Sequence, residues 1–106
     1  MTPEAPAFAQ EIFGPVMPIT PFATLEEGIR LANQTEHGLA SYTWTNNLHT
    51  ARTVAESLEF GMVGVNDWNP FATEGPFTGW KESGVGSESG AEGLNEYLET
   101  KLVAIA

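Results

Sequence analysis

A helical repeat followed by a short apolar run constrains the fold of this chain more than any other feature. Apolar residues recur at helical spacing at Leu48, Ala51, Val54, Ala55 and Leu58. The run GMVGVN at 61–66 has the length and the apolar character of a short strand, and residues 40–45 form a candidate strand before the helix. The helix is long enough to connect two parallel strands, so this region predicts a strand–helix–strand unit.

The N-terminal third adds a lead-in, an edge strand and a helix. Residues 1–10 are rich in proline and alanine and predict a flexible lead-in. Residues 16–22 are apolar but hold two prolines, which cannot donate to a strand ladder, so this run is at best an edge strand. Thr24 and Glu27 have the spacing of a capping box, which predicts a helix in TLEEGIRLANQ.

The C-terminal part predicts one more helix and one more strand. Ser89 and Glu92 repeat the capping-box spacing and predict a helix start. Leu94 and Leu98, with Ala91, are expected to face inward from this helix. Residues 99–106 are expected to form a closing strand.

The element order β-α-β-α-β-loop-α-β predicts an α/β fold, a partial doubly wound and mostly parallel sheet over residues 11–98. In such folds, ligands bind beyond the carboxyl ends of the strands. The segment 67–87 follows one such end and shows no periodicity. We therefore expect a long functional loop there.

Charge and composition exclude several classes of function. Fourteen acidic residues face four basic ones, so the net charge of −10 argues against nucleic-acid and membrane partners. The absence of cysteine excludes disulfides and thiolate metal sites, and His37 and His49 lack the spacing of a metal site. We expect no metal. No run approaches the roughly 20 apolar residues that span a bilayer, and the N-terminus lacks signal-peptide features. A cytoplasmic location is therefore expected.

Three stretches resemble functional motifs to different degrees. GVGSESG at 84–90 is one residue too long for a dinucleotide fingerprint and follows a loop, which favours glycine-driven turning into the last helix. Lys81, Glu82 and Ser83 are adjacent on a loop without a nearby histidine, so we interpret them as surface polar residues. Four aromatic residues of the 67–87 loop could be core residues or the apolar wall of a ligand pocket. They are Trp68, Phe71, Phe77 and Trp80.

Several motifs in this order resemble the C-terminal portion of the NAD(P)-dependent aldehyde dehydrogenase superfamily. They are QEIFGPVMPI, EEGIRLANQTEHGLASYTWT, GMVGVN, PFTGWKESGVG and NEYLETKLVAI, and they extend from about residue 8 to the end. The resemblance implies that Glu11 accepts hydrogen bonds from the nicotinamide ribose, a role that suits an acceptor-only carboxylate. It implies that Phe13 packs at the nicotinamide end, and that Phe71 and Phe77 line the aldehyde tunnel.

The resemblance also implies that parts of the machinery are missing. In the family a cysteine nucleophile, a glutamate base and the coenzyme domain lie upstream of the matched region, so we expect no catalytic residue and no activity from this chain alone. The family cofactor is NAD or NADP, and we expect this chain to bind neither tightly. Thr78 stands where glycine is usual and Ser87 where arginine is usual, which brings close packing at Thr78 into question.

Several roles for such a chain remain open at this point. The first is a C-terminal fragment of an aldehyde dehydrogenase. The second is a self-associating or docking interaction module. The third is a small binding module with weak affinity for nucleotides or aldehydes, and the fourth is an enzyme of another chemistry. We expect a homo-oligomer, with a dimer favoured, held partly by an oligomerisation strand at 99–106.

Overall fold

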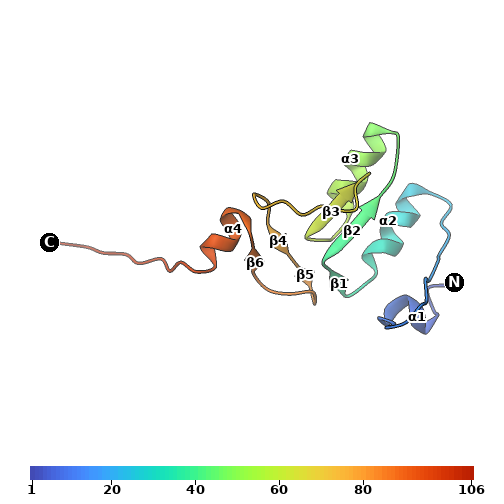
Figure 1. Ribbon diagram of the computed structural model, residues 1–106, viewed down its shortest axis with the longest axis horizontal. Helices are drawn as coiled ribbons and strands as arrows, with labels where there is room; N and C mark the ends of the chain where they lie inside the picture. The colour runs from blue at the N-terminus through green and yellow to red at the C-terminus, as the bar shows by residue number, and fades with distance from the viewer.

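The computed structural model describes residues 1–106, and the expected strand–helix–strand unit forms its centre (Figure 1). Strand β2 (Ala40–Thr43) and strand β3 (Met62–Val65) are parallel, and helix α3 (Leu48–Ser57) connects them. Their register places Ala40 opposite Met62 and Thr43 opposite Val65. The prediction of a parallel pair joined by a helix is confirmed.

Helix α3 begins at Leu48 because Asn47 caps it. The Asn47 side-chain oxygen accepts a hydrogen bond from the backbone N–H of Thr50 at 2.9 Å. Asn46 and Asn47 both precede the helix in the sequence, and the structure identifies Asn47 as its cap. The helix ends at Ser57, where Leu58 turns to extended backbone, although the apolar spacing in the sequence continues to Leu58.

Helix α2 (Leu25–Asn33) starts with the predicted cap. The Thr24 hydroxyl accepts from the N–H of Glu27 at 3.2 Å, and the Glu27 carboxylate accepts from the N–H of Ala23 at 2.8 Å. At its other end, the Asn33 amide donates to the carbonyl of Ser57 at 2.8 Å. This last bond fastens the end of α2 to the end of α3.

The core is small and lies where α2, α3 and β3 meet. Its buried hydrophobic side chains are Leu31, Ala51, Val54, Leu58 and Met62. Of the five apolar residues at helical spacing in 48–58, three are buried as expected and Ala55 is half-buried, but Leu48 is exposed, so the repeat does not predict burial at the first turn. Many large apolar side chains elsewhere in the chain remain exposed.

The sequence predicted that the segment 67–87 is a loop without regular structure, and this prediction is wrong. It contains the two-residue strands β4 (Phe77–Thr78) and β5 (Trp80–Lys81), and β6 (Ser87–Glu88) starts at its end. Strand β5 pairs antiparallel with β1 (His37–Gly38), and β4 pairs antiparallel with β6. A two-residue strand is too short to show a period of two, which explains why the sequence gave no sign of them.

The structure also lacks the single doubly wound sheet that we predicted. The strands form three separate pairs, of which only β2–β3 is parallel. The expected edge strand at 16–22 is irregular, and its prolines remove two of its donors. Residues 99–106 form no strand because no neighbouring strand of this chain lies beside them.

The two ends of the chain differ from their predictions in detail. Helix α1 (Pro6–Ala9) lies within the expected flexible lead-in. Helix α4 (Gly90–Asn95) begins where predicted, but Ser89 makes no side-chain cap and adopts a φ of 60°. Leu94 and Leu98 are exposed and so is Ala91, so the expected inward face is wrong. The helix instead packs through Gly93, where an added Cβ would lie 2.7 Å from the Glu88 carbonyl carbon.

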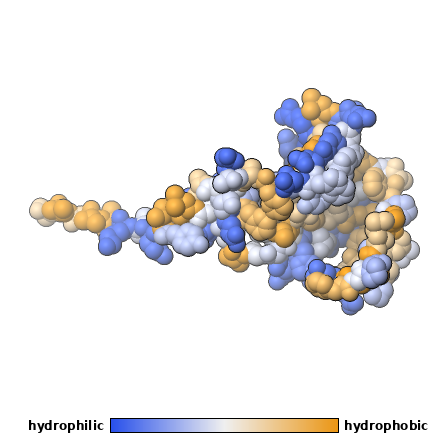
Figure 2. Space-filling view, in the orientation of Figure 1, coloured by the Kyte–Doolittle hydropathy of each residue, from blue (hydrophilic) through white to orange (hydrophobic).

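The C-terminal tail makes the molecule elongated. Residues after α4 extend away from the rest of the chain, and the principal extents are 66 × 33 × 25 Å (Figure 1). The tail side chains of Leu102 and Ile105 are each 93% exposed, and Figure 2 shows hydrophobic residues at its outer end. The radius of gyration is 17.7 Å, compared with about 13 Å for a compact chain of this length.

None of the four helices is both long and apolar enough to cross a bilayer. The side chains of His, Asp and Glu form no group of three or more that could hold a metal ion.

Candidate functional site

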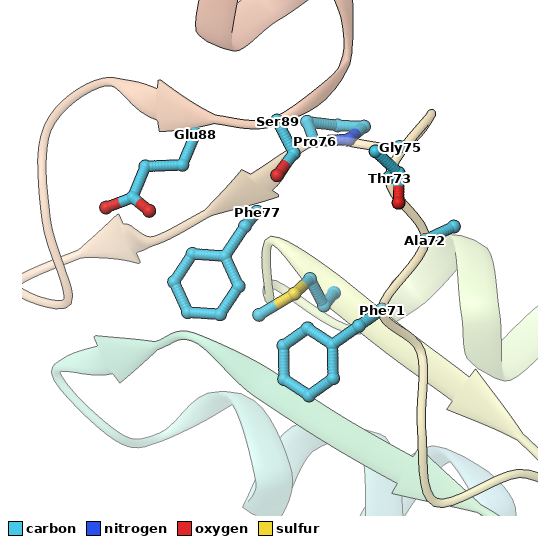
Figure 3. A pocket seen from close by; sticks show the side chains of 9 residues that line it. Phe71, Ala72, Thr73, Gly75, Pro76, Phe77, Glu88 and Ser89 are labelled. Atoms are coloured by element: carbon cyan, nitrogen blue, oxygen red, sulfur yellow. The ribbon is translucent and has the colours of Figure 1, made fainter.

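Phe71 and Phe77 form one wall of a pocket of about 320 Å³ (Figure 3). Phe77 comes from β4, and Phe71 comes from the segment that follows β3. Their rings stack with centroids 5.5 Å apart and an interplanar angle of 17°. The pocket is open to solvent, and its lining includes Met62, Glu88 and Ser89. The structure thus brings together the two phenylalanines that the sequence singled out for a ligand wall.

The other two aromatic residues of this segment lie elsewhere. The Trp68 ring lies 4.2 Å from the Trp44 ring and 5.6 Å from the Tyr42 ring, measured between centroids. Trp80 is half exposed and lines neither this pocket nor the Trp68 cluster. Tyr42 and Trp44 were not predicted as partners of Trp68, although their separation by two residues at a strand indicates that they share one face.

Glu11 and Phe13 lie apart from the phenylalanine pocket. Glu11 lines a separate cavity of about 410 Å³ together with His37 and Ser83. Its carboxylate makes no hydrogen bond or ion pair within the chain, so its acceptor sites face solvent. The Phe13 ring is 94% exposed and lines no cavity beside Glu11. A carboxylate with free acceptors fits a ribose diol, whereas Phe13 has no surrounding wall in this chain.

Lys81 and Ser83 are structural, which extends their interpretation as surface polar residues. The Lys81 ammonium lies 2.7 Å from the Glu59 carboxylate and donates to the carbonyls of Asn33 and Thr35 at 2.9 and 3.2 Å. The Ser83 hydroxyl accepts from the N–H of Gly38 at 2.9 Å. Both side chains therefore hold the β1–β5 pair in place, and neither is arranged as a catalytic group.

The glycines of 84–90 turn the chain into α4, as expected. Gly84, Gly86 and Gly90 have φ values of 149°, 86° and 60°, which residues with a Cβ rarely adopt. Thr78 and Ser87, the two departures from the family pattern, lie opposite each other in the β4–β6 pair. The Thr78 hydroxyl donates to the Gly86 carbonyl at 3.2 Å, so the strand accommodates this β-branched side chain.

Asn66 is a residue whose role the sequence analysis did not identify. It has a φ of 55°, and its side chain both accepts from the N–H and donates to the carbonyl of Thr45, each at 2.9 Å. These two bonds fasten the carboxyl ends of β2 and β3, where the chain enters the segment that carries Phe71. Asparagine tolerates a positive φ better than most residues, and its identity at position 66 was the only sign in the sequence of a turn at the end of β3.

The carboxylates that line the pockets are those of Glu11, Glu88 and Glu96, and no lysine or arginine lines them. The single ion pair of the chain joins Lys81 to Glu59. Glu4, outside these pockets, has a pKa below its ordinary value because the Thr2 hydroxyl and the Glu4 backbone N–H stabilise its carboxylate.

Residues 1–103 match the model of the aldehyde dehydrogenase family. A curated relative, succinate-semialdehyde dehydrogenase of Paenarthrobacter nicotinovorans, is 46% identical over 102 residues, which are 96% of this chain and 23% of that protein. The chain spans about one fifth of the length of the curated relatives it matches.

Solved structures of α/β proteins from the same family have the same fold over this region. The indole-3-acetaldehyde dehydrogenase of P. syringae, solved with NAD+, matches 95% of this chain and 20% of its own, with a TM-score of 0.89 and 38% identity. Betaine aldehyde dehydrogenase of Staphylococcus aureus, also solved with NAD+, matches 88% of this chain and 18% of its own, with a TM-score of 0.83 and 42% identity.

Proposed function

Because the chain belongs to the aldehyde dehydrogenase family, we propose that it forms the C-terminal portion of the catalytic domain of an NAD(P)-dependent aldehyde dehydrogenase. The reaction of such an enzyme converts an aldehyde to a carboxylic acid. In this proposal Phe71 and Phe77 line the aldehyde site, Glu11 binds the nicotinamide ribose, and Phe13 packs at the nicotinamide end. The observation that carries the proposal is the stacked Phe71–Phe77 wall of one open pocket.

The proposed role of the phenylalanine wall is to bind and orient the aldehyde. Two apolar rings remove water from one side of a bound carbonyl and restrict the directions from which it can be approached. When bound, NAD or NADP supplies the acceptor for the hydride of the aldehyde. Glu11 has free carboxylate oxygens that can accept two hydroxyl donors, which supports its role toward the ribose.

The aldehyde-binding role can be tested with isobutyramide, a stable compound with the carbonyl and branched chain of a small aldehyde. Titration of the isotope-labelled chain should shift the amide resonances of Thr73 and Gly75, which line the pocket. Phe71→Ala should remove these shifts, whereas Phe13→Ala, an exposed control, should retain them. Equal shifts in both variants would show that the phenylalanine wall is not the binding site.

We also propose that these 106 residues do not oxidise aldehydes when assayed alone. Their sequence contains no cysteine that could supply a thiolate nucleophile. The assay follows reduced-cofactor absorbance with NAD and NADP against aliphatic, aromatic and carboxylated aldehydes. Turnover above that of buffer, lost in Phe77→Ala, would refute this proposal and favour an enzyme of another chemistry.

The same reasoning predicts weak cofactor binding by this chain. One or two ribose hydrogen bonds to Glu11 contribute roughly 0.5–1.5 kcal/mol each, which does not offset the several kcal/mol lost on association. NAD should therefore bind with a Kd no lower than about 1 mM by calorimetry. Micromolar binding that is lost in Glu11→Gln would favour the alternative of a small nucleotide-binding module.

Self-association is a second proposed function, and the exposed C-terminal tail supports it. Leu102, Val103 and Ile105 are exposed on an extended segment that pairs with no strand of this chain. Such a segment can add a strand to a second copy, so we propose a dimer held partly by residues 99–106. Light scattering after gel filtration should give a dimer for the full chain and a monomer for a chain ending at Glu99. A monomeric full chain, or equal association of both chains, would refute it.

A further inference from the structure

Asn66 forms a bracket between the carboxyl ends of β2 and β3. Its side-chain oxygen accepts from the backbone N–H of Thr45, and its side-chain amide donates to the carbonyl of the same residue, each at 2.9 Å. Its backbone N–H donates to the carbonyl of Thr43 at 2.8 Å. The strand register ends at Thr43 opposite Val65, so these bonds extend the pairing beyond the last ladder residues. Every partner in the bracket belongs to this chain.

The bracket also sets the direction of the chain after β3. Asn66 has a φ of 55° and lies at a bend, so the backbone leaves the strand direction here. Asparagine is suited to this conformation because its short polar side chain can hydrogen-bond locally. Just beyond the bend, the Trp68 ring packs on the Trp44 ring with centroids 4.2 Å apart. The segment therefore starts out against the end of β2.

Phe71 lies on this path, five residues after Asn66, and its ring stacks on that of Phe77 with centroids 5.5 Å apart (Figure 3). Phe77 has its own support, because β4 pairs with β6. The far end of the segment is held where the N–H of Gly90 donates to the carbonyl of Thr73 at 3.2 Å. Phe71 therefore depends on Asn66 for its position on the N-terminal side.

A small rotation at the bracket is enough to separate the two rings. Five residues reach at most about 17 Å, so a rotation of about 10° at Asn66 displaces Phe71 by up to about 3 Å. Aromatic pairs attract at centroid separations of about 4.5–7 Å. A displacement of that size would move the Phe71–Phe77 pair outside this range from its present 5.5 Å.

We infer that Asn66 is a positioning residue for the aldehyde wall, because its bracket to Thr45 holds Phe71 against Phe77. Asn66 is not part of the pocket lining and acts through the backbone of residues 67–71. This inference rests on the proposed function and adds to it the residue that controls the geometry of the substrate wall.

The stack gives a readout that does not depend on ligand binding. In the 106-residue chain, the ring protons of Phe71 and Phe77 should give a nuclear Overhauser cross-peak. Asn66→Gly keeps a positive φ accessible but removes both side-chain bonds. It should lose most of this cross-peak and weaken isobutyramide binding about fivefold or more, because the binding-competent arrangement becomes less populated. The matched control is Asn69→Gly, the same exchange at an exposed residue of the same segment, and it should retain both.

Asn66→Asp is a milder second variant for the case in which Asn66→Gly does not fold. It keeps the oxygen that accepts from the Thr45 N–H but places an acceptor against the Thr45 carbonyl, so an intermediate cross-peak and intermediate binding are expected.

A loss of stability in urea with an unchanged cross-peak, in either variant of Asn66, would show a purely structural role and overturn the inference. Equal behaviour of Asn66→Gly and Asn69→Gly would overturn it as well. If the cross-peak responds as expected but the unsubstituted chain does not bind isobutyramide, the positioning of Phe71 by Asn66 stands and the proposed aldehyde wall fails.

Discussion

Replacing Gly61 by alanine tests how closely β3 and β4 must approach each other to build the phenylalanine pocket. A Cβ at position 61 would lie 1.9 Å from the carbonyl oxygen of Thr78. Ordinary contact begins at 3.4 Å, so the two backbone segments would have to separate by about 1.5 Å. Overpacking of this kind lowers the free energy of unfolding by about 1–3 kcal/mol. Alanine also restricts the unfolded chain more than glycine does, which raises the free energy of unfolding by about 0.4–1 kcal/mol.

The overlap at Gly61 involves backbone atoms that cannot rotate away, so the cost belongs at the upper end of that range. We expect Gly61→Ala to lower the free energy of unfolding by about 2 kcal/mol, measured by urea denaturation with circular dichroism. It should also weaken isobutyramide binding, because β4 carries Phe77. Gly14→Ala is the matched control, since an added Cβ there has no atom within 4 Å. Equal stability of the two variants would refute the reasoning.

Three further substitutions test the fold by the same denaturation assay. Leu58→Ala should cost about 2–5 kcal/mol because Leu58 is buried, whereas Val85→Ala, at a fully exposed side chain outside the proposed dimer segment, should cost less than about 0.5 kcal/mol; equal losses would contradict the assigned core. Asn47→Ala should cost about 1 kcal/mol through the lost cap of α3, and Asn46→Ala should cost less, so the reverse order would contradict the capping assignment. Lys81→Met should destabilise the chain more at low salt than at high salt, because it removes the ion pair to Glu59, and a salt-independent loss would assign the effect to packing or to the carbonyl hydrogen bonds.

The sequence by itself determined the elements that depend on local spacing. The apolar period of 48–58, the capping residue Thr24 and the valine-containing run at 61–66 each predict structure from neighbours within a few residues. The family, and the roles that its resemblance implies for Glu11, Phe13, Phe71 and Phe77, also came from local motifs. The prediction failed for the short strands β4, β5 and β6, whose two residues each carry no period.

Only the tertiary structure decided which of these residues meet. Strand β4 pairs with β6 and not with a segment nearer in sequence. This pairing places Glu88 beside Phe77, which stacks on Phe71. Trp68 lies apart from them, against Trp44. The inward face expected for α4 failed for a related reason: a side chain at helical spacing becomes buried only where another element covers it, and nothing in this chain covers Leu94. Local patterns arise from the geometry of one element. Contacts between distant residues depend instead on how closely separate backbone segments can approach each other. Glycines such as Gly61 and Gly93 set this distance, because a Cβ there would overlap the facing backbone.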